Sequence, residues 1–435
     1  MSTIDPKTLK GFRDFLPDQQ ITRQRMIETI RASYEAFGFE PLETPALEYA
    51  EILTGKYGDE GDKLMYRFKD NGDRDVALRY DLTIPLARVV AQYGDIKKPF
   101  KRYQISPVWR AENTQKGRFR EFYQCDADIA GSSSALADAE ILALAANTLR
   151  ALGIRPADFV VRVNSREIIA AFYDSLDLSD TAKTAAIRAV DKIDKIGRQG
   201  VSDELRKSGL SGEAAESILA FADTSIDAVN DESELAKIGE ALPSIQKPLA
   251  VLADIIEKAS VLAPDARFVV DFSIARGLDY YTGMIFETTL ASAPQYGSVL
   301  SGGRYDNLVG MFANKPVPAV GASIGLDRLF AALEELKLVP AQKTVARAII
   351  VNFDESLTDD YLALASELRV AGVNTILYFD AVDIKKQLSY ASDRGIRYAL
   401  IYGANEAKSG KVMVKNLETG DQREVLWKDI AQSLV

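Results

Sequence analysis

The sequence predicts an α+β protein with three parts: an antiparallel sheet flanked by helices, a helical insertion within that domain, and a small C-terminal α/β domain. Strand-like blocks follow one another between residues 75 and 131 with no regular helix between them, which favours antiparallel pairing. Residues 179–264 have helical periodicity and almost no strand signal. After residue 345, near-continuous apolar strands alternate with helical stretches, which is typical of parallel strands.

The N-terminal half contains the first elements of the predicted sheet domain. A helix is expected over 23–37, because apolar residues recur there at helical spacing and Gly38 follows as a stop. Two prolines in 41–53 suggest an extended segment and a turn. Strands are expected over 75–82, 100–110, 119–131 and 159–165, with a helix over 134–152 that ends at Gly153.

The rest of the sheet domain follows the predicted insertion. Strands are expected over 267–273 and 284–290, and 319–333 reads as a strand and glycine turn that lead into a helix. We therefore assign 1–335 to the sheet domain, about 179–264 to the insertion and 345–435 to the α/β domain, with a linker between the domains. The insertion has two open interpretations, a packing appendage or a segment that contacts substrate.

Composition excludes several classes of protein. The 435 residues favour two domains, and no apolar run approaches the ~20 residues that span a bilayer, so we expect no membrane segment. One cysteine, Cys125, excludes an intrachain disulfide framework and, without a signal-like N-terminus, predicts a cytoplasmic protein. The absence of histidine excludes Ser-His-Asp and Cys-His hydrolases and argues against a zinc site, while Mg²⁺ stays open.

A basic segment stands out in this acidic chain. The net charge of −10 argues against a protein that coats nucleic acid non-specifically, yet residues 95–122 contain eight basic and three acidic side chains. A strand-loop-strand hairpin over 110–124 would bring its arginines together, and strand alternation would put Arg118, Arg120 and Phe122 on one face. Two interpretations are open, a nucleotide site or a solvated, salt-bridged hairpin.

Two further segments combine glycine with polar side chains. In residues 275–287, the adjacent Tyr280 and Tyr281 would point to opposite faces of a strand, so we expect at most one to line a given pocket. Gly302 and Gly303 read either as a flexible turn that approaches a ligand or as an ordinary turn. The common nucleotide motifs GxxxxGK[ST] and GxGxxG after a strand are absent.

Taken in order, five segments resemble the class II aminoacyl-tRNA synthetases. LRYDLTIPLAR (78–88), VWRAENTQKGRFREFYQCDADIAG (108–131), ARGLDYYTGMIFE, SGGRYDNLVGMF and ASIGLDRL carry the resemblance. RGLDYYTG is similar to a signature of the histidine-specific family, and the resemblance covers nearly the whole chain. It implies a six-stranded antiparallel sheet, a helical insertion, a C-terminal α/β anticodon-binding domain, a homodimer, and ligation of L-histidine to tRNA(His) with ATP, which carries Mg²⁺.

The resemblance also implies roles for individual residues. For ATP, Arg110 and Arg276 would contact the α-phosphate, and the other contacts would come from Glu112, Arg118, Phe122 and Arg328. Arg110 and Arg276 would be the catalytic residues. For histidine, the α-amino group would be held by Asp81, Thr83 and Gln124, the carboxylate by Arg276, and the imidazole by Asp128 and Tyr281, with Tyr280 beside them. The tRNA acceptor end would pass Thr114, Gln115 and Lys116, and no side chain is implied as a metal ligand.

Two alternatives share this fold without the ligase activity. One is the synthetase-like regulatory subunit of ATP phosphoribosyltransferase, against which the arginine set and the C-terminal domain both argue. The other is a non-catalytic tRNA-sensing module. The ligase differs from both because it exchanges pyrophosphate into ATP in the presence of histidine.

Overall fold

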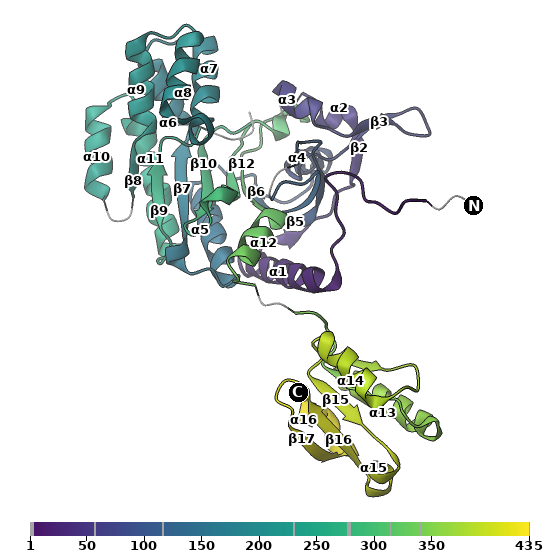
Figure 1. The fold of residues 1–435 in the computed structure, drawn as a ribbon. Coiled ribbons are helices and arrows are strands. Elements are labelled where there is room, and N and C mark those ends of the chain that lie inside the picture. The colour runs from purple at the N-terminus through teal and green to yellow at the C-terminus, as the bar shows by residue number, and fades with distance from the viewer. Residues whose placement is uncertain are drawn as a thin grey trace. The chain divides into compact units, whose positions relative to one another are not determined.

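The computed structural model describes residues 4–55, 58–114, 117–228, 231–275, 280–313, 315–339 and 342–434. The chain divides into two compact units, Met1–Arg13 with Met26–Leu338 and Asp14–Arg25 with Val339–Val435 (Figure 1). None of the helices in these ranges is long and apolar enough to cross a membrane.

The larger unit is built on a nine-stranded sheet. Six neighbouring strands, in the order β5-β6-β12-β11-β10-β7, pair antiparallel and confirm the expected class II sheet. Beyond these six, β1 is parallel to β5 at one edge, β9 is parallel to β7, and β8 pairs antiparallel with β9 at the other edge. The strands are β1 (Glu40–Pro41), β5 (Phe100–Trp109), β6 (Glu121–Ala130), β7 (Phe159–Ser165), β8 (Ser225–Asp227), β9 (Phe268–Asp271), β10 (Met284–Leu290), β11 (Ser298–Arg304) and β12 (Ala319–Gly325).

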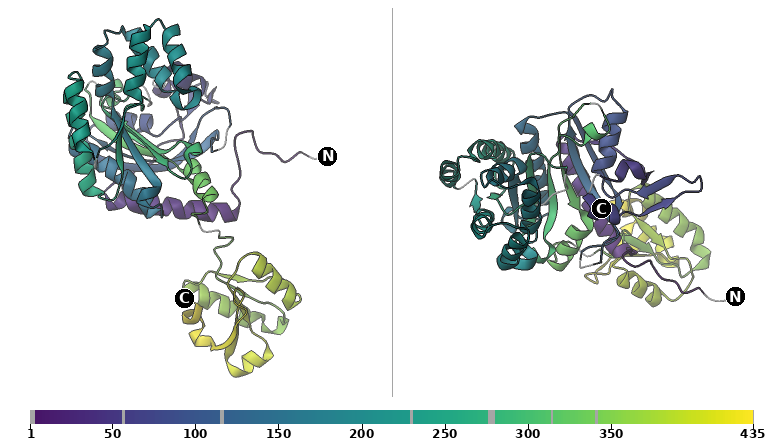
Figure 2. Two further views of the ribbon diagram at one scale, coloured as in Figure 1. Left: turned by 60° about the vertical axis from the view of Figure 1, so that its left-hand side comes forward. Right: turned by 90° about the horizontal axis from the view of Figure 1, so that it is seen from above.

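Helices cover this sheet. Helix α1 (Pro17–Ala36) begins before the expected residue 23, because Pro17 suits a first helical position, and Gly38 follows it at φ +75°. Helix α5 (Ala135–Ala151), which Ser134 caps, packs on β6, β11 and β12. Helix α11 (Gln246–Leu262) packs beside α5 (Figure 2). Helix α12 (Leu326–Glu335) follows β12 directly, as expected.

A small second sheet lies within the same unit. Strands β2 (Leu47–Tyr49), β4 (Asp75–Leu78) and β3 (Arg67–Lys69) pair antiparallel beside the short helices α2 (Ala50–Leu53) and α3 (Gly58–Lys63). The strand expected over 75–82 therefore ends at Leu78, because the chain turns after it and enters helix α4 (Thr83–Gln92).

The insertion is helical, as expected, apart from β8. It comprises α7 (Asp180–Val190), α8 (Ile193–Lys207), α9 (Gly212–Ala222), α10 (Glu232–Ala241) and α11 (Gln246–Leu262), and α7, α8 and α9 gather into one bundle (Figure 1). Three stacked rings join this bundle to the sheet domain. Phe221 of α9 lies 3.9 Å from Phe172 of α6 (Arg166–Asp174) and 4.4 Å from Phe272, centroid to centroid.

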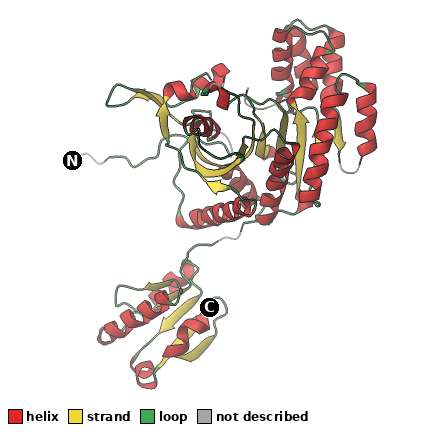
Figure 3. Cartoon of the chain, turned by 180° about the vertical axis from the view of Figure 1, so that it is seen from behind, coloured by secondary structure: helices red, strands yellow, loops and turns green. Residues whose placement is uncertain are grey.

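The C-terminal unit is an α/β domain with a five-stranded sheet, visible from behind in Figure 3. As expected, β14 (Thr375–Leu377), β13 (Ala348–Ile350) and β15 (Tyr398–Ile401) are parallel, and β16 (Lys411–Asn416) and β17 (Gln422–Leu426) continue antiparallel. Its helices are α13 (Thr358–Val370), α14 (Ile384–Asp393), α15 (Ala404–Ser409) and α16 (Ile430–Leu434).

Candidate active site

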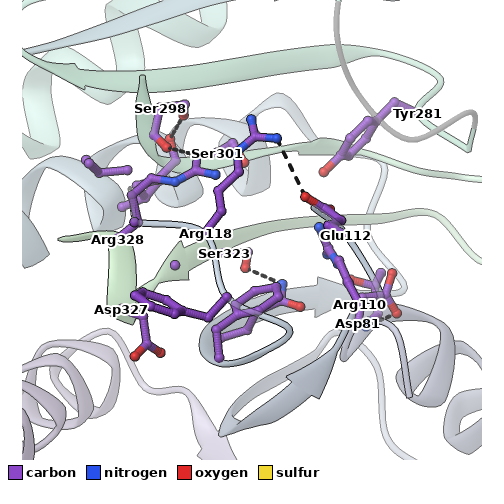
Figure 4. Close-up of a pocket in the computed structure, with 18 of the residues that line it drawn as sticks. Asp81, Arg110, Glu112, Arg118, Tyr281, Ser298, Ser301, Ser323, Asp327 and Arg328 are labelled. Atoms are coloured by element: carbon purple, nitrogen blue, oxygen red, sulfur yellow. Dashed lines mark hydrogen bonds and ion pairs between the residues drawn. The ribbon is translucent and has the colours of Figure 1, made fainter. Parts of the chain in front are cut away.

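A cleft lies where the hairpin between β5 and β6 meets the ends of β11 and β12. The hairpin supplies charged and aromatic side chains, and the sheet supplies the floor (Figure 4). The lining includes ten of the residues that the resemblance implied: Asp81, Thr83, Arg110, Glu112, Arg118, Phe122, Gln124, Tyr280, Tyr281 and Arg328. Residues as far apart in sequence as Asp81 and Arg328 thus share one cavity.

The hairpin fixes Arg110 at one wall. Beyond the last β5-β6 pair, Arg110 N donates to Arg120 O over 2.9 Å and continues the ladder. Its Nε donates to the carbonyl of Tyr80 over 3.1 Å, and its guanidinium carbon lies 5.2 Å from the ring centroid of Phe122. The guanidinium is therefore oriented before any ligand arrives, next to an aromatic face.

Three arginines, Arg110, Arg118 and Arg328, line the same cleft, and Glu112 lies among them. Arg118 lies 3.6 Å from Glu112, and Arg328 donates to the carbonyl of Ser298 over 2.6 Å. Burial lowers the pKa of Arg328 from its ordinary value, and the positive charges of Arg118 and Arg110 lower it further. Such clustered guanidinium groups match the geometry and charge of phosphate oxygens, so this end of the cleft suits a polyphosphate.

The floor takes its polar side chains from β6 and β12. Gln124 and Ser323 point into the cleft because alternate residues of a strand share a face. Gln124 Nε2 donates to Ser323 Oγ over 2.7 Å and lies 3.4 Å from Asp126 Oδ1. Its Oε1 is buried without a hydrogen-bond partner among the described residues, so it can accept a hydrogen bond from the N–H of a ligand amine.

Asp81 and Thr83 stand at the start of α4. Asp81 Oδ1 accepts from the backbone N–H groups of Thr83 and Ile84 over 3.2 and 3.0 Å, which fixes the carboxylate at a helix N-terminus. The side chain of Thr83 hydrogen-bonds Tyr280, whose pKa is raised by burial. A buried carboxylate, a threonine and a tyrosine thus gather beside Gln124.

Asp128 lies behind this end of the cleft rather than in its lining. Its carboxylate is 2.8 Å from the guanidinium of Arg102, and it accepts a hydrogen bond from the phenol of Tyr305. The pKa of Tyr281 is raised first by burial and next by the negative charge of Asp128, which lies close to it. Asp128 thus lies near Tyr281 but outside the lining, and two other side chains hold Asp128 in place.

A second buried carboxylate, Asp126, shares the same cation. Burial raises the pKa of Asp126 to about 7, opposed by Arg102 and aided by Asp128. Because two close carboxyl groups face one guanidinium, ionisation of both carboxyl groups at once is disfavoured. The floor of the cleft is therefore a buried network of charges.

The interpretation of Gly302 and Gly303 as an ordinary turn is wrong, because both glycines lie inside β11. An added Cβ at Gly302 would lie 2.1 Å from the carbonyl of Gly321, and one at Gly303 would lie 3.0 Å from the ring of Tyr281. Gly321, opposite Gly303 in β12, would place a Cβ 1.9 Å from Asp128 Oδ1. These glycines make room for Tyr281 and Asp128.

Two other predictions about side-chain direction are also wrong. Arg120 does not join Arg118 and Phe122 in the cleft, because β6 begins only at Glu121 and the alternation of a strand does not extend to 118–120. Tyr280 and Tyr281 both line the cleft, because β10 begins only at Met284 and residues 280–283 are not part of a strand.

Three implied residues, Arg276, Gln115 and Lys116, lie outside the described residues. Thr114 is exposed on the hairpin and is not part of the lining.

Sequence reasoning missed other lining residues, which are Gly117, Phe119, Ser298, Val299, Leu300, Ser301, Ser323, Gly325 and Asp327. The strand pattern of β12 could have revealed Ser323, whereas the serines of β11 have no distinctive signal. Within the described ranges, no cluster of three or more acidic or cysteine side chains could hold a metal ion.

The chain is similar to known proteins along its whole length. The histidyl-tRNA synthetase family model matches residues 11–329, and the anticodon binding domain model matches 340–435. The histidine–tRNA ligase of Rhodopirellula baltica is 45% identical over 430 residues, covering 98% of this chain and 96% of that protein. That of Cytophaga hutchinsonii is 41% identical and covers 99% of both. The crystal structure of the histidyl-tRNA synthetase from Nostoc sp. PCC 7120 superposes with a TM-score of 0.89 at 36% identity, covering 99% of both chains.

Proposed function

Because the chain belongs to the histidyl-tRNA synthetase family, we propose that its cleft is the place where ATP and L-histidine react. The activity is that of a histidine–tRNA ligase, an aminoacyl-tRNA synthetase. The observation that carries the proposal for the cleft is the cluster of Arg110, Arg118 and Arg328 beside the buried polar floor. The roles proposed below for individual residues are those that the family resemblance implies, and this geometry supports them.

The arginine end of the cleft is assigned to ATP. Arg110 would face the α-phosphate, Arg118 the outer phosphates, and Arg328 the opposite side of the nucleotide. Phe122 would stack on adenine, and Glu112 would accept from its amino edge. Mg²⁺ would enter with the phosphates of ATP as part of the substrate, since phosphate oxygens are ligands that Mg²⁺ prefers.

Formation of histidyl-adenylate needs no protein base. The carboxylate of histidine is already ionised, attacks the α-phosphorus, and pyrophosphate leaves with the electron pair of the broken P–O bond. The task of the protein is to align the two substrates and to face the developing charge with fixed cations. A chain without histidine residues can perform this chemistry.

The polar end of the cleft is assigned to histidine. Asp81, Thr83 and the buried Oε1 of Gln124 would hold the α-ammonium group, which needs acceptors. Asp128 and Tyr281 would bind the two ring nitrogens, with Tyr280 packed at their side. An apolar amino acid would leave these buried groups unpaired, which can reduce its use by several powers of ten.

Transfer to tRNA is the second step. The terminal ribose hydroxyl of tRNA(His) would attack the activated carbonyl, and a phosphate oxygen of the adenylate would take its proton, since no imidazole of the protein is available. Thr114, Gln115 and Lys116 are assigned to the passage of the acceptor end. If replacing that phosphate oxygen with sulfur left the transfer rate unchanged, the proposed route of the proton would be wrong.

Three broader properties complete the proposal. The C-terminal domain, which matches the anticodon binding domain model, would bind the tRNA anticodon. The chain would form a homodimer, because Tyr49 and Phe68 are 53% and 47% exposed and both stand opposite Val76 in the small sheet, which leaves aromatic surface for a second copy to cover. The protein would act in the cytoplasm, consistent with its single, buried Cys125.

Charging of tRNA tests the whole proposal. The purified protein should attach labelled histidine to tRNA(His) in an ATP-dependent reaction. The regulatory-subunit and tRNA-sensing alternatives both predict no charging. Full-length similarity to histidine–tRNA ligases at 38–45% identity already argues against them.

A further inference from the structure

The N-terminal strap, which we define as residues 9–13, crosses the base of the hairpin that carries Arg110. Its carbonyl at Gly11 accepts from Arg120 N over 2.9 Å, and its carbonyl at Lys10 accepts from Arg120 Nη1 over 3.4 Å. Gly11 has φ +88°, and an added Cβ would lie 2.7 Å from the Arg120 side chain. The strap therefore fits this hairpin closely and requires glycine at residue 11.

The strap supplies the hydrogen-bond acceptor for the backbone N–H of Arg120, just before β6 begins. Residues 118–120 precede β6, yet Arg120 O accepts from Arg110 N while Arg120 N donates to Gly11 O. The strap thus fixes the backbone on which Arg110 depends. At the same point, the ring of Phe12 packs edge-on against Tyr66 at 6.1 Å and anchors the strap from the other side.

Arg13, the last residue of the strap, contacts two walls of the cleft from outside. Its Nη2 donates to Asp327 Oδ1 over 2.6 Å, and its guanidinium carbon lies 3.6 Å from the ring centroid of Phe119. Asp327 and Phe119 both line the cleft, whereas Arg13 does not. One side chain therefore connects the hairpin to the start of α12.

Asp327 connects the ion pair with Arg13 to strand β6 at the floor of the cleft. It is 2% exposed, and its second oxygen, Oδ2, accepts from Tyr123 N over 2.8 Å, where β6 extends beyond the end of β12. The next residue is Arg328, which faces the other two arginines of the cleft. The position of Arg328 is thus linked to the ion pair of Arg13 and Asp327.

We propose that Arg13 is a positioning residue for ATP: through Phe119 and Asp327 it holds the nucleotide end of the cleft in shape. Neither of these two contacts involves Asp81, Gln124 or Tyr281, and Asp327 meets the strand of Gln124 through the backbone N–H of Tyr123, so the histidine end should depend on Arg13 less than the ATP end does. This inference rests on the proposed function of the cleft.

The test compares steady-state constants for both substrates in pyrophosphate exchange by the full-length protein. Arg13→Gln should raise the KM for ATP by about ten-fold, as expected for the loss of a charge-assisted hydrogen bond, and should change the KM for histidine less than two-fold. Arg13→Lys keeps the charge for Asp327 but loses the planar contact with Phe119, so it should restore part of the effect. Arg155→Gln, which breaks the exposed pair of Arg155 and Asp158, is the matched control and should change neither constant.

Coupling distinguishes positioning from a general structural role. Arg13→Lys and Phe119→Leu should be non-additive in the KM for ATP, because both change the same contact. Additive effects, or equal rises in both KM values, would overturn the proposal. If Arg13→Gln does not fold, the double-mutant cycle of Arg13→Lys and Phe119→Leu still tests whether Arg13 acts through Phe119. A wild-type protein without exchange would instead refute the proposed function, whereas an active wild type with unaltered Arg13 variants would refute only this inference.

Discussion

Gln124 donates its side-chain N–H to the hydroxyl of Ser323 over 2.7 Å, across the pair of strands β6 and β12. This bond determines which end of the amide faces the cleft, because a donor occupies the serine side and Oε1 is left as the acceptor. An amide in this orientation suits an ammonium group and not a carboxylate. The relationship therefore assigns the direction in which the amino acid lies.

Removing the hydroxyl of Ser323 should weaken the preference of the Gln124 amide for an ammonium group. In Ser323→Ala, we expect the KM for histidine to rise about five-fold, equivalent to about 1 kcal/mol for one hydrogen bond, with a smaller change for ATP. Steady-state pyrophosphate exchange measures both constants. Ser260→Ala, which removes a hydroxyl bonded within helix α11, is the control. A larger effect on ATP than on histidine would contradict the assignment.

Arg328 should act mainly on the rate. Its guanidinium is held by the carbonyl of Ser298 and faces two other cations, so it is oriented for a phosphate before ATP binds. Arg328→Gln should lower kcat by about 100-fold, similar to the loss of one pre-oriented donor to a transition state. Single-turnover formation of adenylate measures this step. An unchanged rate would remove Arg328 from the nucleotide site.

The buried pair of Asp128 and Arg102 should be important for stability. Asp128→Ala leaves the 0% exposed Arg102 without its ion pair, and the free energy of unfolding should fall by about 3–5 kcal/mol. Chemical denaturation followed by circular dichroism measures the loss. Asp180→Ala, which removes an exposed partner of Lys183, should cost less than about 1 kcal/mol. Equal losses in the two variants would argue against the buried network.

The same network should make stability depend on pH. Asp126 has a pKa raised by burial to about 7, above the ~3.9 of an unfolded chain, so the folded state binds more protons between these values. The stabilisation that Asp126 adds to the free energy of unfolding is thus complete below about pH 4 and is lost as the pH rises through 7. The charged and polar groups that face it are Arg102, Asp128, Ser323, Gln124 and Asp81.

Asp126→Asn removes this titration. Between about pH 4 and pH 7, the free energy of unfolding of the wild type should fall by up to about 1.4 kcal/mol per pH unit relative to that of the variant. Urea denaturation at pH 5 and pH 8 measures the difference. A stability difference between the two proteins that does not change with pH, or one that shifts in favour of the wild type from pH 5 to pH 8, would contradict the raised pKa.

Glycine at residue 321 should be required by the Asp128 carboxylate. Gly321→Ala would place a methyl group 1.9 Å from Asp128 Oδ1, and we expect a loss of about 1–3 kcal/mol together with a raised KM for histidine. Gly325→Ala, on the same strand, has its nearest neighbour at 3.8 Å and should leave stability almost unchanged. Thermal unfolding of both variants checks the contrast.

The sheet and its hairpin were predictable because their signals are local. The strands around Gln104 and Gln124 have β-rich sequences, and the helix after Gly325 follows a clear strand and turn. The C-terminal domain has the continuous apolar strands of a parallel sheet. These patterns depend on neighbours in sequence, so they can be read without coordinates.

The errors arise where distant segments decide the structure. Gly302 and Gly303 resemble a turn, but the contacts that require them come from Gly321 and Tyr281. Arg120 points away from the cleft because Gly11, more than 100 residues earlier, accepts its backbone N–H. The contacts of Asp128 with Arg102 and Tyr305 likewise join three strands or loops, and no local pattern encodes them.

The most direct test of the central claim is pyrophosphate exchange into ATP by the purified wild-type protein. If the cleft joins ATP to histidine, labelled pyrophosphate should enter ATP when L-histidine is present and should not do so with other amino acids. No exchange, or exchange that does not require histidine, would contradict the assignment of the cleft.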